Sequence, residues 1–150
     1  MKLYIWFILL SIVAWGCYVP TIHHGGTLLK GPLRAFLCVG IAYFLTAVIV
    51  PLVLLKGFQL EPWEWNTEGI TFSTVAGIAG AAGALGIILA VKAGGSPLVI
   101  APLVFAGAPV VNTLVTMGWK PPSTAPGPLF YLGLLLAASG AFMVLRFKPV

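Results

Sequence analysis

The chain has 150 residues, of which 60% are hydrophobic and only 7% are charged, and its mean hydropathy is +1.08. Soluble domains carry about 25% charged residues, so this composition excludes a water-soluble globular domain. The net charge is +5, but the eight basic residues are scattered among apolar runs and form no patch for a nucleic acid. We therefore expect an all-α, polytopic membrane protein whose surroundings are the lipid bilayer.

Five stretches without Asp, Glu, Lys or Arg divide the chain. A membrane-spanning helix needs about 20 predominantly apolar residues, and each stretch is long enough. No alternation with a period of two appears, which argues against a transmembrane barrel. The sequence predicts one transmembrane domain over 1–150 with helices at about 3–22, 33–55, 70–91, 98–117 and 128–145.

The first stretch follows Lys2 and so also fits a secretory signal peptide. No small residues of the A-x-A type follow at a suitable place, so we expect this segment to remain as a membrane helix. Segment 23–32 holds two histidines, three glycines and a proline, which is typical of a loop. We therefore expect the first helix to end near Ile22.

The basic residues give a weak orientation signal. The side with five is expected to be cytoplasmic, which places Lys2 outside. A difference of only two charges is compatible with insertion in both orientations. We expect a multi-pass protein of a cell membrane, of the prokaryotic inner-membrane kind. One side receives Lys30, Arg34, Lys92, Arg146 and Lys148, and the other receives Lys2, Lys56 and Lys120.

The adjacent pair His23 and His24 raises the question of a metal site. Adjacent rings on a helix point about 100° apart, whereas a metal-binding pair needs a spacing such as four residues. No Cys, Asp or Glu lies near them in the sequence. Polar side chains at the membrane interface are one interpretation, and a titrating role near neutral pH is the other. We expect no metal and no other cofactor.

Glycine recurs every three residues in the third helix, at Gly77, Gly80, Gly83 and Gly86. A surface of small residues lets two helix backbones approach closely, so the pattern favours helix packing. Glycine also loosens a helix, so movement of this helix during a conformational cycle is the alternative.

The fourth helix contains Pro102 and Pro109, and each removes one backbone hydrogen bond. Discontinuous helices build substrate sites in transporters, although a kink without a ligand fits equally well. Asn112 and Thr113 follow, and we expect them either to form hydrogen bonds between helices or to contact a ligand.

Several signatures of catalysis are missing from the sequence. The expected spans contain no Asp or Glu, so a proton relay based on a buried carboxylate is unavailable. No phosphate-binding loop and no nucleophile with a neighbouring base is recognisable, so we expect no enzyme. The acidic residues Glu61, Glu64 and Glu68 fall in one loop with two tryptophans, which is typical of a segment along the membrane interface.

Short patterns recur in a recognisable order along the chain. They are Trp15-Gly16, the glycine- and alanine-rich segment 77–93, the proline-containing segment 98–116, and the spaced pair Gly133 and Gly140. In this order the chain resembles one five-helix repeat of the drug/metabolite transporter superfamily, in its EamA-like branch. It departs where family members often carry a Glu after the fourth helix, since Gly118-Trp119-Lys120 stands there.

The resemblance implies two five-helix repeats in opposite orientation that export or exchange small metabolites. We therefore expect a half-size transporter of small organic solutes that acts as a homodimer with antiparallel copies. Its solute site is expected to be lined by Trp15, Tyr18, Tyr43 and Asn112. A non-transporting accessory subunit of a larger membrane complex is the alternative.

Overall fold

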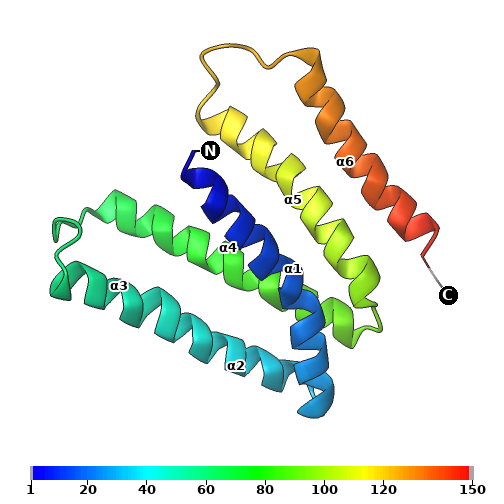
Figure 1. The fold of residues 1–150 in the computed structure, drawn as a ribbon, viewed down its shortest axis with the longest axis horizontal. Coiled ribbons are helices and arrows are strands. Elements are labelled where there is room, and N and C mark those ends of the chain that lie inside the picture. The colour runs from blue at the N-terminus through cyan, green and yellow to red at the C-terminus, as the bar shows by residue number, and fades with distance from the viewer. Residues whose placement is uncertain (1, 149–150) are drawn as a thin grey trace. The chain divides into compact units, whose positions relative to one another are not determined.

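The computed structural model describes residues 2–148, which form helices and connecting segments without a strand in that range (Figure 1). Five helical segments are long and apolar enough to cross a membrane. The predicted all-α, polytopic fold is therefore confirmed. The spans are α1 (Tyr4–Leu28), a composite second span (Pro32–Gly57), α4 (Thr67–Lys92), α5 (Pro97–Trp119) and α6 (Pro128–Arg146).

The first helix is longer than the sequence predicts. α1 continues through both histidines and both following glycines to Leu28, so the expected end near Ile22 is wrong. Where a helix ends near hydrocarbon, the free backbone N–H and carbonyl groups lose their helical hydrogen bonds, and no water is available to replace them. This penalty outweighs the roughly 1 kcal/mol by which a glycine disfavours a helix.

The second span is not one regular helix. It consists of α2 (Pro32–Phe44), the π-helical turn η1 (Leu45–Ile49), the short α3 (Val50–Leu52) and a second π-helical turn η2 (Val53–Gly57). Pro51 has no N–H, and its ring collides with the carbonyl four residues earlier. The backbone responds with a wider turn, in which the Val50 N–H donates to the Leu45 carbonyl.

Side chains and prolines fix where the other helices begin. The Gly69 N–H donates to Asn66 Oδ1 over 2.7 Å, which caps α4. The hydroxyl of Ser96 accepts from the Leu98 N–H over 3.3 Å at the start of α5. α5 and α6 both open with a proline, whose missing N–H has no partner to lose in the first turn.

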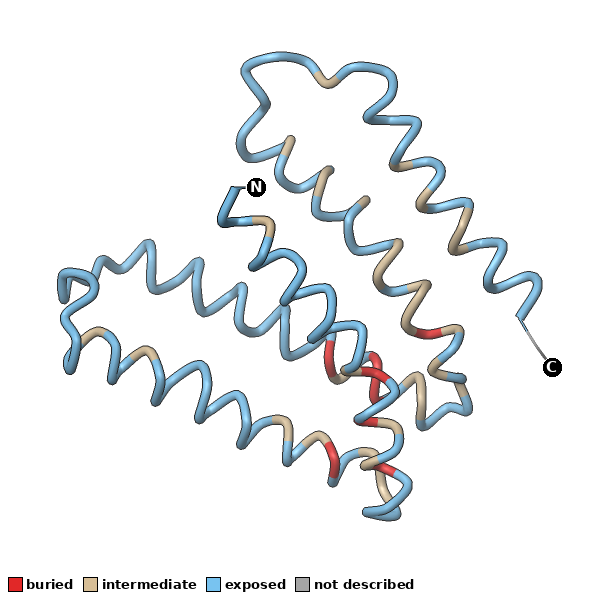
Figure 2. The backbone as a smooth tube through the Cα atoms, in the orientation of Figure 1, coloured by how far each residue is buried: buried red, intermediate tan, exposed pale blue. Residues whose placement is uncertain are grey.

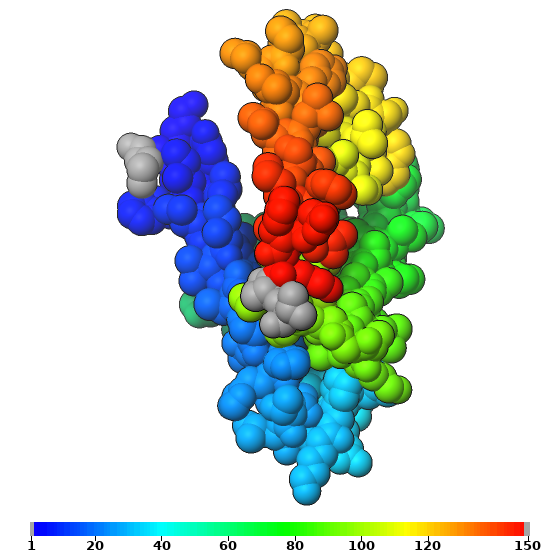
Figure 3. All heavy atoms as spheres, turned by 90° about the vertical axis from the view of Figure 1, so that its right-hand side faces the viewer, coloured from blue at the N-terminus to red at the C-terminus, as the bar shows by residue number. Residues whose placement is uncertain are grey.

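The contacts group the chain into two compact units. One holds the described parts of Met1–Val19 and Gly95–Val150, and the other is Pro20–Gly94. Within the first unit α5 and α6 lie side by side, and Figure 3 shows the orange-to-red side chains of α6 against the yellow ones of α5. Within the second unit α2 and α4 lie side by side.

Very little of the apolar surface is buried (Figure 2). Seven hydrophobic residues are buried, and no charged or polar residue is buried among those described. Large exposed apolar side chains run along all five spans, a surface that lipid solvates and water does not. The buried hydrophobic residues are Val19, Ile22, Ala35, Ala84, Ile87, Ile88 and Ile100.

The end of α1 and the start of α2 approach each other closely at Gly26. A Cβ at this position would lie 3.3 Å from Cα of Pro32, whereas a Cβ at Gly25 would meet nothing within 4 Å. We expect Gly26→Val to lower the free energy of unfolding by about 1–3 kcal/mol relative to Gly25→Val, because it overpacks this contact. The two variants share the same helix, so propensity effects cancel. Denaturation in mixed micelles measures the difference, and equal stabilities would contradict the close approach.

Candidate membrane-embedded site

Three aromatic side chains form a cluster between α1 and α5. Trp15 and Tyr18 stand three residues apart on α1 and so share a face, with ring centroids 5.4 Å apart. Phe105 of α5 approaches Trp15 edge-on, with centroids 6.0 Å apart and an interplanar angle of 69°. Both geometries fall in the favourable range for aromatic pairs. The structure thus brings two of the predicted site residues together and adds Phe105, which sequence reasoning missed.

α5 is not interrupted at either proline. Pro102 and Pro109 nevertheless lack an N–H, so the carbonyls of Leu98 and Phe105 receive no regular bond from within the helix. The hydroxyl of Thr113 donates to the Pro109 carbonyl over 2.8 Å. Thr113 is therefore occupied by its own helix, which leaves Asn112 as the open polar side chain of this pair.

Asn112 lies on the same face of α5 as Phe105, two turns or about 10.5 Å further along the axis. Its side chain is exposed, and no hydrogen bond to it is found within residues 2–148. It stands seven residues before α5 ends at Trp119, deeper in a span than any described Asp, Glu, Lys, Arg or His. An amide in hydrocarbon without a partner is costly, so this position calls for a ligand or a second chain.

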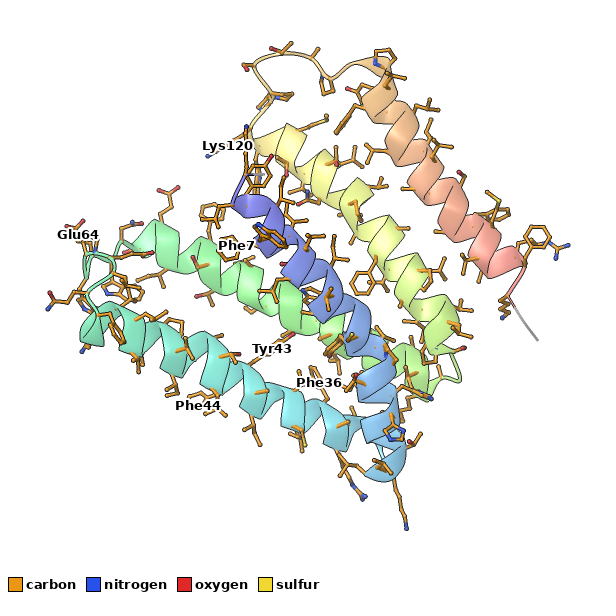
Figure 4. The ribbon with its side chains drawn as sticks, viewed as in Figure 1. Phe7, Phe36, Tyr43, Phe44, Glu64 and Lys120 are labelled. Atoms are coloured by element: carbon orange, nitrogen blue, oxygen red, sulfur yellow. The ribbon has the colours of Figure 1, made fainter. Side chains whose placement is uncertain are left out.

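Tyr43, the fourth predicted lining residue, belongs to the other unit. It lies on α2 on the side toward α4, whereas Phe44 points away (Figure 4). The Tyr43 side chain is 42% exposed. Its role in a solute site remains a prediction.

The glycine face of α4, formed by Gly77, Gly80, Gly83 and Gly86, is open. A Cβ built at any of these four positions meets nothing within 4 Å, and all four are exposed. The described helices of this chain therefore do not fill this surface. Close packing through it remains a prediction that needs a second chain.

The two histidines lie near the end of α1 rather than in a loop. His24 is exposed, and its carbonyl accepts a hydrogen bond from the Thr27 hydroxyl over 2.6 Å. His23 is half-buried, and its Nδ1 is buried without a hydrogen-bond partner. The rest of the chain described here gathers no group of three metal-ligating side chains around either ring.

The segment between η2 and α4 carries exposed acidic and aromatic side chains, including Glu64 (Figure 4). Trp63 and Trp65 contact each other edge-on with centroids 5.2 Å apart. Nζ of Lys56 lies 4.7 Å from the centre of the Trp63 ring, within reach of a cation–π interaction. This combination is typical of a membrane–water boundary.

No protein-family model, curated protein or solved structure matches the chain.

The contact between α1 and α5 can be tested by a double-mutant cycle. We expect Trp15→Leu and Phe105→Leu to show a coupling energy of about 0.5–1.5 kcal/mol in detergent unfolding, because each removes the same aromatic pair. Phe142 of α6 is 66% exposed, and Phe142→Leu serves as the matched control. Combined with Trp15→Leu, it should add within about 0.5 kcal/mol. Full additivity in both cycles would refute the cluster.

Proposed function

We propose that the chain is a half-size membrane transporter of small polar organic solutes. The observation that carries the proposal is the exposed, unpaired amide of Asn112 within α5. Polar side chains inside a membrane face a bundle interior or a pathway, because lipid offers them no partner. A transported solute supplies that partner only when it is bound, which suits a site that must fill and empty.

The aromatic cluster fits such a solute. Ligand sites are largely apolar and aromatic, with a few polar groups that set orientation. Trp15 and Phe105 provide ring faces, and Asn112 provides one donor and one acceptor group further along the same face of α5. The carbonyl of Phe105, which receives no regular helical hydrogen bond because Pro109 lacks an N–H, adds an acceptor near the cluster. A small solute with both hydrogen-bonding and apolar parts matches this set.

A homodimer is part of the proposal. Glycine surfaces associate in membranes because they let backbones approach, and the face of α4 lacks a partner helix in the described chain. Two copies would supply two such faces and ten helices, as the resemblance to paired five-helix repeats implies. The distribution of basic residues, five against three, permits an antiparallel pair in a prokaryotic inner membrane.

An accessory subunit is the second candidate, and the same glycine face favours it. A helix of any other membrane protein with a small-residue surface would fit against α4 equally well. The two candidates differ in composition after purification. The transporter is a dimer of this chain alone, whereas the subunit is found with other chains.

The solute site can be tested by thermal unfolding of the purified protein with a panel of amino acids, amines, nucleosides and sugars. We expect at least one class to raise the melting temperature of a dimer. Asn112→Leu should lower the affinity for that solute by about tenfold, since the hydrogen bond of one amide contributes roughly 1–1.5 kcal/mol.

Ser139→Ala is the matched control, because the Ser139 hydroxyl already donates to the Leu136 carbonyl of its own helix. Its response to the solute should equal that of the wild type. A panel without a responding compound, or an unchanged response in Asn112→Leu, would contradict the proposed site.

A further inference from the structure

A cavity of about 350 Å³ lies within the unit Pro20–Gly94, where the end of α1, the start of α2 and the end of α4 meet. Its volume falls in the range of small-molecule sites, about 300–1,000 Å³. The wall is apolar, with Ile22, Ile88 and Val91, and no acidic side chain lines it among the described residues. The polar lining includes His23, Lys30 and Lys92.

The two lysines of this cavity have no anion to pair with. Neither is in an ion pair within the described part of the chain. The nearest acidic residue on α4, Glu68, stands 24 residues before Lys92, about 36 Å away along the helix axis. The other two glutamates, Glu61 and Glu64, lie in the segment that precedes α4. Three of the four basic residues of the unit thus lie at one end, and its three acidic residues lie at the other end together with Lys56.

His23 adds an unused polar atom to the same cavity. Its Nδ1 is buried and lacks a hydrogen-bond partner. A buried imidazole nitrogen without a partner is costly, and most such atoms in folded proteins are paired. An anion in the cavity would accept a hydrogen bond from this nitrogen when it carries a proton.

The backbone of Lys30 is held in the left-handed region, with φ of 52°. The Gly31 N–H donates to the Gly26 carbonyl and the Lys30 N–H to the Thr27 carbonyl, which is the Schellman ending of a helix. Glycine normally occupies the position of Lys30, and another residue costs about 1 kcal/mol there. The chain therefore keeps a lysine where a glycine would be more stable.

Stabilisation of helix ends explains only part of this arrangement. Cations near carbonyl ends are favourable, and Lys92 is the last residue of α4. At the end of α1, however, Arg34 already provides a cation, and its Nη1 donates to the Leu29 carbonyl over 3.0 Å. Helix-end electrostatics account neither for the left-handed Lys30 nor for the unpaired Nδ1 of His23.

We propose that this cavity binds the phosphate of an anionic phospholipid, with Lys30, Lys92 and His23 at the headgroup and the apolar wall beside the acyl chains. The cavity lies at the ends of three membrane-spanning helix segments, where headgroups are found. Basic pockets between membrane helices suit such headgroups, and each nearby lysine contributes about fivefold in affinity. Soluble phosphate compounds share the charge but not the apolar tail.

The test uses the full-length protein in neutral detergent with three separate additions: dioleoylphosphatidylglycerol, dioleoylphosphatidylcholine and inorganic phosphate. We expect phosphatidylglycerol to raise the melting temperature and to stay bound in native mass spectrometry. Phosphatidylcholine should do neither. Stabilisation by inorganic phosphate equal to that by phosphatidylglycerol would overturn the assignment to a lipid.

The variants separate lipid binding from helix capping. Lys30→Gly relaxes the backbone, so without lipid it should melt no lower than the wild type, while its affinity for phosphatidylglycerol falls about fivefold or more. Lys92→Gln should lower the affinity for phosphatidylglycerol by a similar factor. Lys120→Gln, which removes the same charge at the end of α5, is the control and should bind as the wild type does.

Two results with these variants would also contradict the proposal. One is an equal loss of affinity in Lys120→Gln, which would mean general attraction to a basic protein. The other is a lower melting temperature of lipid-free Lys30→Gly with an unchanged response to phosphatidylglycerol, which would assign Lys30 to the helix end alone.

Discussion

Hydrogen bonding of the backbone within each span is the constraint on which this structure depends. Hydrocarbon offers no partner to a free N–H or carbonyl, so a crossing segment has to satisfy its own backbone. The chain obeys this constraint even where its residues oppose a helix. α1 runs through two adjacent glycines, α5 runs through two prolines, and the second span widens into π-helical turns around Pro51. Hydroxyl groups follow the same rule, since those of Thr46, Thr71 and Thr113 donate to carbonyls four residues earlier.

Three positions do not follow this rule, and each indicates a site for a bound molecule. Asn112 is exposed within a span, His23 Nδ1 is buried without a partner, and Lys30 occupies a backbone position that favours glycine. Each feature costs stability in the isolated chain. A bound molecule would give Asn112 and His23 a hydrogen-bond partner, and an anion beside Lys30 would offset the cost of its backbone conformation. A polar solute or a second copy would satisfy the amide of Asn112, whereas an anionic headgroup would satisfy the basic side chains of the cavity between α1, α2 and α4.

The five spans could be predicted because charge is so costly in lipid that its spacing marks the helices. The start of α6 at Pro128 also followed from the sequence. The end of α1 did not, because glycine and histidine favour a loop in water but not where hydrocarbon offers the backbone no other partner. Pro51, preceded by three β-branched residues, was the unused signal for the irregular second span. The contact of Phe105 with Trp15 joins two helices that are far apart in the sequence, so no local sequence pattern predicts it.

Hydrogen–deuterium exchange in lipid nanodiscs tests the five membrane crossings most directly. Because only seven hydrophobic residues are buried within the described chain, lipid rather than a protein core has to keep water from most of the backbone. Five crossings predict five protected blocks that coincide with the spans, with rapid exchange at residues 61–66 and 121–127 in the two longest of the connecting segments. Exchange along the whole length of any one span at the rate of these connecting segments would contradict the five-span fold.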